Sequence, residues 1–399
     1  MKKVNERGVT SILILVIIAS TFMGTLLTGY ASVGSSLYKS VTNKNLVGDF
    51  VTRMISGLEK GWNDGVFLRS QIIDIYGGIQ RCLGKRIVND ADPNKTVMLG
   101  SDGNLYFYGN VTGIDNEEAM NSNIKKLSEF KRFCKDRGVN FLFVIAPDKY
   151  NSDQVSLPLS VKDYMEITRE FTTCLVQEEV CCLNLQELLK KESRSYTNAF
   201  FRTDHHWRIH TAFWGLQKIT EKMWPRDTAL LSIDNFTSEI ASTEFLGSMG
   251  IRAGKLYAEA DTVFLIAPTF ETDLTVEYQT KTLKSKVVRK GPFRKSVIDM
   301  SNPGYNMYIT SDNALIHVVN YKQHNGRRVM FIKDSFGVPV AAWMSLLSKE
   351  LWVVDVRYAQ EKSVCQMVED YGISDIIMMY NPGMLGSEMF RFREVSNGK

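Results

Sequence analysis

An aspartate and two histidines stand together in the stretch Phe201-Arg-Thr-Asp-His-His-Trp207, in a chain that has only five histidines. Histidine is the side chain best suited to take a proton near neutral pH, and a neighbouring carboxylate fixes its tautomer and stabilises its charged form. Asp204 and His206 therefore offer, from one loop, the orienting acid and the base of an acyl-transfer reaction. The alternative is a helix start with Asp204 as the N-cap and solvated histidines.

A serine that fits such a base lies in Phe331-Ile-Lys-Asp-Ser-Phe-Gly337, between a predicted strand and a predicted helix. At this kind of turn the hydroxyl is presented at the end of the sheet, and the backbone N–H of the serine can stabilise an oxyanion. The alternative is that Asp334 or Ser335 only caps the following helix. Together with the Asp-His pair, Ser335 is predicted to be a nucleophile that forms an acyl-enzyme.

Apolar runs alternate with amphipathic segments and predict the elements that position these residues. Wholly apolar strands followed by helices are typical of an α/β fold with a doubly wound parallel sheet, whose active site lies in the loops after the strands. The loops of interest are 147–158, 202–207, 334–337, 356–358 and 381–386. The predicted strands are 140–146, 180–185, 328–333, 351–355 and 375–380, and the predicted helices are 116–136, 161–177, 207–223, 337–348 and 359–370.

The region 226–325 differs in character, because 261–266, 274–278 and 315–319 read as strands with no helices between them. It is predicted to be a mostly β insertion that borders the active site. The whole chain is accordingly divided into 1–32 (a cytoplasmic tip and a transmembrane anchor), 33–116 (a membrane-proximal region) and 117–399 (the catalytic domain).

The N-terminus predicts a membrane anchor. Lys2, Lys3 and Arg7 precede the segment 9–31, which has no charged residue and is long enough for a transmembrane helix. Basic residues before the span favour a single-pass protein of the cell membrane, with its N-terminus in the cytoplasm and its catalytic domain outside. The alternative is a signal peptide cleaved near Tyr30-Ala-Ser-Val33, which also places the remaining chain outside the cytoplasm.

Composition supports a folded globular protein, with 44% hydrophobic and 23% charged residues. A net charge of only +4, with the charges interspersed, argues against nucleic-acid binding. The cysteines fit no metal-binding pattern. Outside the cell Cys174 can pair with Cys181 or Cys182, and buried free thiols are the alternative. The six cysteines are Cys82, Cys134, Cys174, Cys181, Cys182 and Cys365.

The motif Thr203-Asp-His-His-Trp207 resembles that of the DHHW proteins, which are similar to the alginate O-acetylation proteins of the AlgJ and AlgX type, where the motif is Asp-Thr-His-Trp. The resemblance covers about 120–385 and implies an SGNH hydrolase-like fold in which Asp and His precede Ser. It extends to four further stretches, Ala146-Pro-Asp-Lys149, Phe245-Leu-Gly-Ser248, Asp334-Ser335 and Asp355-Val-Arg-Tyr358.

Residue roles follow from this resemblance by position. Asp204 would orient the base His206, and Ser335 would be the nucleophile; His205 aligns with the Thr of the alginate relatives. Arg357 would be a neighbour of the developing charge, and Lys149 would bind an anionic sugar or close its own loop. The candidate oxyanion or substrate contacts are Arg357, Asn381, His205, Lys149 and Trp207.

The function that the resemblance implies is extracytoplasmic O-acetyl transfer to a cell-surface or secreted polysaccharide through an acetyl-enzyme, or acetylester hydrolysis if water is the acceptor. No cofactor is expected. Because acetyl-CoA is cytoplasmic, family analogy implies a membrane partner of the MBOAT type that exports acetyl groups.

Two other functions remain open. Asp204, His205, His206 and His210 offer metal ligands, with His206 and His210 one helical turn apart, so a metal-dependent hydrolase is one alternative. The other is a non-catalytic polysaccharide-binding or assembly protein in which Trp207 and Trp214 stack on sugars.

Overall fold

The computed structural model describes residues 23–25, 29–42, 68–90, 92–108, 117–153, 156–158, 161, 163–192, 196–279, 285–358 and 360–395. The chain separates into two compact units, Met1–Leu83 and Gly84–Lys399. The first unit contains helices α2 (Tyr30–Thr42) and α4 (Arg69–Cys82). Within the described ranges, no helix has the length and apolar character needed to cross a membrane, and the predicted span 9–31 falls mostly outside those ranges.

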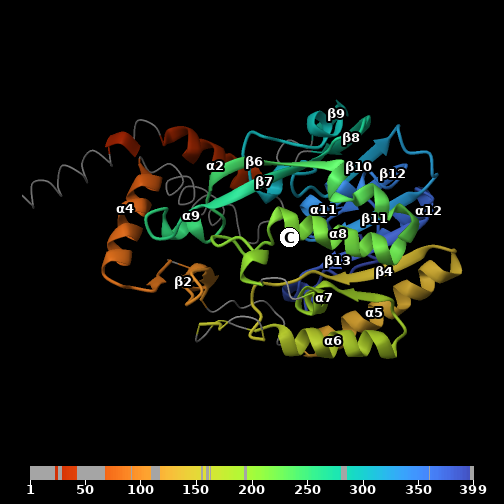
Figure 1. Cartoon of the computed structure of the whole chain (residues 1–399), viewed down its shortest axis with the longest axis horizontal. Coiled ribbons are helices and arrows are strands. Elements are labelled where there is room, and N and C mark those ends of the chain that lie inside the picture. The colour runs from red at the N-terminus through yellow and green to blue at the C-terminus, as the bar shows by residue number, and fades with distance from the viewer. Residues whose placement is uncertain are drawn as a thin grey trace, which may run out of the picture. The chain divides into compact units, whose positions relative to one another are not determined.

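An eight-stranded mixed sheet in the order β5-β4-β13-β11-β12-β10-β8-β9 forms the centre of the second unit (Figure 1). The first five strands are parallel, as the sequence predicted, while the last three pair antiparallel. The five strands predicted for the parallel sheet are thus confirmed, and the sheet continues into antiparallel strands that the sequence analysis had assigned to an insertion. The strands are β4 (Asn140–Ile145), β5 (Cys182–Asn184), β8 (Leu274–Gln279), β9 (Lys286–Gly291), β10 (Leu315–Asn320), β11 (Arg328–Lys333), β12 (Glu350–Val354) and β13 (Asp375–Tyr380).

Burial along the strands explains the difference between the two ends of the sheet. Every residue of the central strand β13 is buried, whereas buried and partly exposed residues alternate along β10. A strand covered on both faces is typical of parallel sheets, and an alternating strand is typical of antiparallel ones. The strands β8 and β10, which lie in the region expected to be a β insertion, thus extend the central sheet.

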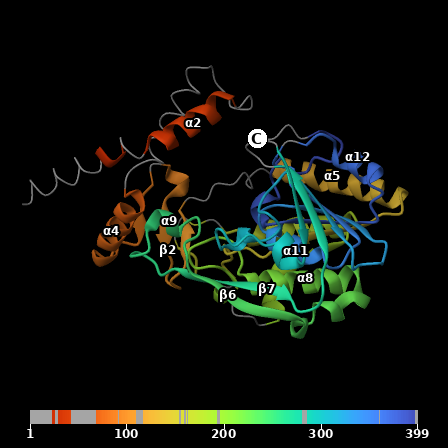
Figure 2. The ribbon, with the colours of Figure 1, turned by 90° about the horizontal axis from the view of Figure 1, so that it is seen from above.

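Helices cover both faces of this sheet and create two hydrophobic cores. Ile377 and Met379 of β13 face the core that α8 and α11 share, while the alternate residues Ile376 and Met378 face the core beneath α5, α6 and α12. Figure 2 shows α5 and α12 together on one side and α8 on the other. The helices are α5 (Glu117–Asp136), α6 (Met165–Gln177), α7 (Leu185–Lys191), α8 (Ile209–Met223), α11 (Gly337–Met344) and α12 (Val364–Asp370).

Helix ends differ most from the prediction at α12, which begins at Val364 and not near 359. Ser363 and Gln366 form a capping box there, in which each side chain accepts a hydrogen bond from the other residue's backbone N–H. The capping box therefore determines where the helix begins, and the apolar periodicity does not.

Smaller elements complete the second unit. A three-stranded antiparallel sheet of β1 (Ile87–Val88), β2 (Val97–Leu99) and β3 (Leu105–Phe107) reaches the Asp-His loop, because the Leu105 N–H donates to the Arg202 carbonyl at 2.9 Å. Residues 84–107 thus lie in the same unit as the central sheet, and the three-part division of the whole chain stays a prediction. The other elements are β6 (Phe236–Phe245), β7 (Asp261–Pro268), α9 (Gly250–Ala253) and α10 (Phe293–Ser296).

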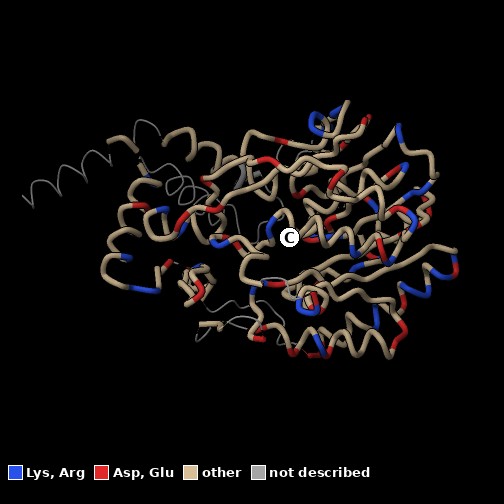
Figure 3. The backbone as a smooth tube through the Cα atoms, viewed as in Figure 1, with Lys and Arg blue, Asp and Glu red and all other residues tan. Residues whose placement is uncertain are grey.

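The structure shows the state of the cysteines and the distribution of the charged residues. All six cysteines are free thiols, and burial raises the pKa of Cys134 and Cys182 to about 12. Of the six, only Cys134 is fully buried, while Cys82 and Cys181 are exposed, so the alternative of buried free thiols holds for Cys134 alone. Basic and acidic residues alternate along the described backbone without forming a continuous basic stripe (Figure 3).

Candidate active site

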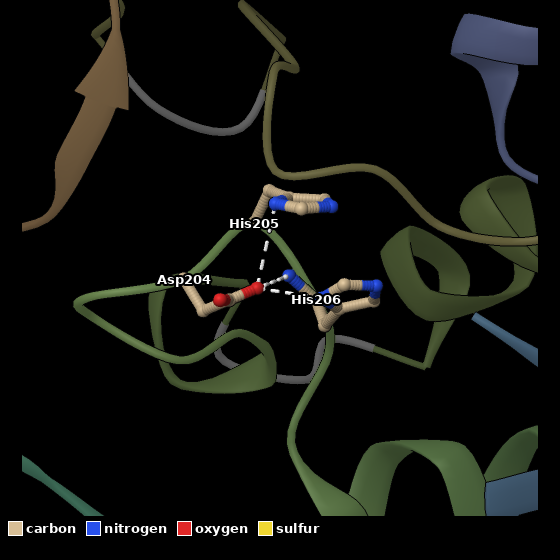
Figure 4. Close-up of side chains that lie close together, drawn as sticks. All are labelled: Asp204, His205 and His206. Carbon is tan, nitrogen blue, oxygen red and sulfur yellow. Dashed lines mark hydrogen bonds and ion pairs between the residues drawn. The ribbon is translucent and has the colours of Figure 1, made fainter. Parts of the chain in front are cut away.

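The structure brings Asp204, His206 and Ser335 into one hydrogen-bonded line. His206 Nδ1 lies 2.6 Å from Asp204 Oδ1, and His206 Nε2 lies 2.8 Å from Ser335 Oγ. Figure 4 shows the carboxylate beside the imidazole of His206. If Nδ1 donates to the carboxylate, Nε2 is left to accept the serine proton. Two segments far apart in the sequence thus meet at the carboxyl edge of the sheet.

The Asp204 carboxylate is buried and accepts three N–H groups. Besides the imidazole, Oδ1 accepts the His206 backbone N–H at 2.9 Å and Oδ2 accepts the Ser248 N–H at 2.6 Å. Burial by itself would raise the pKa of Asp204, but His205, His206 and the Ser248 N–H together hold it well below its usual value. The alternative in which Asp204 caps a helix is wrong, because the N-cap of α8 is Arg208.

The stretch Phe245-Leu-Gly-Ser248 encloses this carboxylate, and Gly247 leaves no space for a side chain. A Cβ on Gly247 would lie 2.2 Å from Asp204 Cβ and 2.3 Å from Asp204 Oδ2. Thr203 helps to hold the contact, since its hydroxyl accepts the Gly247 N–H at 3.0 Å. The glycine therefore allows the backbone to approach the acid closely enough for Ser248 to donate to it.

We expect Gly247→Ala to lower the turnover of a small acetyl ester by about tenfold or more, because a displaced Asp204 no longer orients His206. Steady-state kinetics measures this loss, and circular dichroism checks that the variant is folded. Gly34→Ala is the matched control, since a Cβ there meets nothing within 4 Å. Unchanged turnover in Gly247→Ala would show that the approach of 247 to Asp204 is unimportant.

The turn that carries Ser335 is fixed by its neighbour Asp334. The buried Asp334 carboxylate accepts the Phe336 N–H at 2.9 Å and both the N–H and the Nδ2 of Asn381, at 2.7 and 2.6 Å. Burial raises the pKa of Asp334. Neither Asp334 nor Ser335 is the N-cap of α11, which is Phe336. The Ser335 backbone N–H donates to no acceptor among the described residues. It is therefore able to donate a hydrogen bond to an oxyanion.

Asn381 lies beside the nucleophile, but its side chain serves the turn. Its Nδ2 donates to Asp334 and its Oδ1 accepts the Gly383 N–H at 2.8 Å. Asn381 thus has an indirect role, which is to hold the carboxylate that shapes the Ser335 turn, and its contact with substrate stays a prediction.

Lys149 and Trp207 are both buried and hold the site together. Lys149 Nζ donates to the carbonyls of Phe201, Arg202 and Asp204 at 2.7, 3.0 and 3.0 Å, so it ties its own loop to the segment that carries Asp204. Burial lowers the pKa of Lys149 to about 7 against the opposing effect of Asp261 and Asp204. Trp207 Nε1 donates to the Phe336 carbonyl at 3.0 Å and thereby ties the Asp-His loop to the serine turn.

Arg357 belongs to a cluster of four charged residues at the end of β11, which leads into the Ser335 turn and is called the serine strand below. The four are Lys333, Asp312, Asp355 and Arg357. Arg357 Nε and Nη2 donate to the two oxygens of Asp355 at 2.8 and 2.6 Å, and the buried Lys333 Nζ lies 3.1 Å from Asp355 Oδ2. Lys333 also pairs with Asp312. The Arg357 side chain is 29% exposed, and its charge acts electrostatically on Asp334 and His205.

His205 lies beside His206 and is partly exposed to solvent. Its ring centroid lies 4.0 Å from that of His206, its Nδ1 lies 3.2 Å from Ser248 Oγ, and one-third of the side chain is exposed. Burial and the neighbouring His206 lower the pKa of His205 to about 3, while Asp204 opposes them. His205 is therefore neutral near pH 7.

The metal-binding alternative has a geometric basis, because ligand atoms of Asp204, His205 and His206 lie within 4.8 Å of one another. However, both ring nitrogens of His206 already serve the hydrogen-bonded line, and a metal at either would break it. His210 is not part of this group, and its Nε2 lies 2.9 Å from Ser238 Oγ. These residues fit proton transfer better than metal coordination.

Sequence reasoning missed one aromatic side chain, because Tyr305 lies in a short 3-10 helix (Tyr305–Met307) that carries no motif. Its ring stacks on the His206 imidazole at a centroid distance of 3.7 Å and an interplanar angle of 22°. Trp214, a candidate sugar platform, is buried, as is Trp207, and its Nε1 donates to Glu192 at 2.8 Å. The aromatic surfaces proposed for sugar stacking are thus packed inside the protein.

The sheet, its covering helices and the hydrogen-bonded Asp204, His206 and Ser335 at its carboxyl edge define an α/β domain with the acid, base and hydroxyl of an acyl-transfer site. Residues 97–254 match the family described as the SGNH hydrolase-like domain of the acetyltransferase AlgX, which confirms the resemblance seen in the sequence. The match includes Asp204, His206 and Gly247 but ends before Ser335. Acetyl transfer, in general terms, is the chemistry of the family that this region matches.

Solved structures agree with this fold. PatB1 of Bacillus cereus, solved with a sulfonyl adduct, has a TM-score of 0.61 at 19% identity over 77% of this chain and 99% of its own. A DHHW family protein of Eubacterium siraeum has a TM-score of 0.53 at 19% identity over 76% of this chain and 95% of its own. At such identities the likeness concerns the fold alone. None of the curated proteins matches the chain.

Proposed function

We propose that this protein is a serine-dependent O-acetyltransferase that acts outside the cytoplasm on a cell-surface or secreted polysaccharide. The observation that carries the proposal is the pair of hydrogen bonds that joins Asp204 to His206 and His206 to Ser335, at 2.6 and 2.8 Å. An aligned carboxylate, imidazole and hydroxyl is the arrangement that activates a serine for acyl transfer.

In the first half-reaction, His206 Nε2 takes the proton of Ser335 as Oγ attacks the carbonyl carbon of an acetyl ester. The oxyanion that forms accepts a hydrogen bond from the Ser335 N–H, and Arg357 contributes a positive charge nearby. Collapse breaks the ester C–O bond, and the leaving alkoxide takes the proton from His206. An acetyl group remains on Ser335 Oγ.

In the second half-reaction, a hydroxyl of the acceptor gives its proton to His206 and attacks the acetyl-enzyme, which restores Ser335 with its proton. A sugar hydroxyl gives transfer and water gives hydrolysis. The match to an acetyltransferase family supports transfer. A membrane protein that exports acetyl groups is the proposed source of the donor, and the cell membrane is the proposed location.

Covalent labelling tests the serine directly. Incubation with phenylmethanesulfonyl fluoride should add one sulfonyl group to Ser335, which intact-mass and peptide mass spectrometry would locate. A chromogenic acetyl ester should give a burst of product in the native protein and none in Ser335→Ala. Ser301→Ala, at an exposed serine, is the control and should retain both reactions.

The outcome against this proposal is a folded Ser335→Ala variant that turns over the ester at the native rate. Transfer is then separated from hydrolysis by adding sugar oligomers to the assay and measuring acetylated product. An enzyme that only hydrolyses the ester under these conditions would keep the serine mechanism and lose the transferase assignment.

A further inference from the structure

Tyr305 is the side chain most closely applied to the base, and nothing in the reaction described above uses it. Its ring lies nearly parallel to the His206 imidazole, with centroids 3.7 Å apart. Phe336 lies at a tilt, 4.9 Å from the same imidazole, and His205 is 4.0 Å away. The base is thus surrounded by three rings, of which Tyr305 makes the closest and most parallel contact.

The segment that carries Tyr305 is held at both of its ends. At one end, ahead of the turn at 309–311, the Asp299 N–H donates to the Met307 carbonyl at 2.8 Å. The buried Tyr308 hydroxyl accepts the Ile266 N–H at 2.9 Å. After the turn, Asp312 pairs with the buried Lys333 of the serine strand and lies 3.2 Å from Arg357. The segment is therefore tied to β7 on one side and to the serine strand on the other.

The turn between these two ends is strained. Ile309, Thr310 and Ser311 have φ of 44°, 62° and 68°, a conformation that costs non-glycine residues roughly 1–2 kcal/mol each. Such strain persists only where the surrounding structure imposes it, and it is concentrated at functional sites. Here the strained turn leads directly from the Tyr305 segment to Asp312.

We propose that Tyr305 is a positioning residue for His206, a role that rests on the function proposed above. The hydrogen bond to Asp204 fixes Nδ1, and the stacked ring of Tyr305 restricts tilting of the imidazole, so that Nε2 stays directed at Ser335. The electron-rich face of the phenol also stabilises the imidazolium that forms during acylation. The segment 305–312 thereby becomes a part of the active site.

The ring of Tyr305, and not its hydroxyl, carries this role. The Tyr305 hydroxyl makes no hydrogen bond to any residue that the structure describes, whereas the ring contact is close and parallel. Phenylalanine keeps the ring and removes the hydroxyl, and alanine removes both. The two substitutions therefore separate the contributions.

The test uses the full-length protein with Tyr305→Ala, Tyr305→Phe and the control Tyr321→Ala, where the tyrosine is half exposed. For a chromogenic acetyl ester, kcat of Tyr305→Ala should fall about tenfold with KM unchanged, which corresponds to about 1.4 kcal/mol. Sulfonylation of Ser335 should slow by a similar factor. Tyr305→Phe should stay within about twofold of the native protein, as should Tyr321→Ala.

Nuclear magnetic resonance of the His206 ring supplies a readout that does not depend on activity. Loss of the stacked ring in Tyr305→Ala should broaden the His206 ring ¹⁵N resonances or move them toward the other tautomer, which the loss of a ring current by itself does not do, while Tyr305→Phe should leave them near their native positions. A folded Tyr305→Ala with native kcat, or a Tyr305→Phe as impaired as the alanine variant, would overturn the proposal. If Ser335→Ala remained active, the proposed function would fail, yet the resonances would still decide whether Tyr305 positions His206.

Discussion

Replacing Asp204 by asparagine is expected to lower kcat/KM for a small acetyl ester by about 10³- to 10⁴-fold. Three N–H groups converge on the two oxygens of Asp204, two from His206 and one from Ser248. An asparagine amide offers one oxygen and one NH₂ group, so its NH₂ must face at least one of these donors. The imidazole then turns over or changes tautomer, and Nε2 no longer accepts the Ser335 proton.

Steady-state kinetics together with thermal unfolding of the same preparation measures the Asp204→Asn effect. Asp273→Asn, at an exposed aspartate that makes none of these hydrogen bonds, is the matched control and should keep native kinetics. A folded Asp204→Asn variant that retains more than about a tenth of native kcat/KM would contradict the role of Asp204 in orienting the base.

Asp355→Ala is expected to lower the free energy of unfolding by about 3–5 kcal/mol. Asp355 accepts bonds from the guanidinium of Arg357 and from Lys333, whose ammonium is fully buried. Without Asp355, Lys333 and Arg357 share only the Asp312 carboxylate. The buried Lys333 ammonium then pairs with one carboxylate in place of two. The loss exceeds that of a surface pair because water cannot replace the missing carboxylate.

Urea denaturation with the slope compared between variants measures this stability change. The double substitution Lys333→Met with Asp355→Leu should cost less than the sum of its single substitutions, since it removes the charges together. Lys362→Met, which breaks an exposed ion pair with Asp370, is the control and should cost under about 1 kcal/mol. Equal losses for Asp355→Ala and Lys362→Met would be incompatible with a stabilising buried cluster.

Local sequence patterns were sufficient for most elements of the fold. The strands at 328–333 and 375–380 begin and end at the predicted residues, and α5 begins one residue after its predicted start. Helical periodicity and continuous apolar runs depend on neighbouring residues, so they can be read along the chain. The direction of β10, β8 and β9 in the sheet could not be predicted in this way, because strand pairing depends on residues far apart in the sequence.

The sequence by itself determined which kinds of side chain act at the site, namely a carboxylate, an imidazole and a hydroxyl. It also determined that two of them, Asp204 and His206, lie next to each other. Asp204 and His206 are two residues apart in one motif, so their contact is a local property of the chain. The tertiary structure decided that Ser335 meets His206, that Gly247 and Ser248 enclose the Asp204 carboxylate, and that Tyr305 covers the base. These contacts join segments that are distant in sequence, and only the packing of the sheet and its connecting loops brings them within hydrogen-bonding or stacking distance.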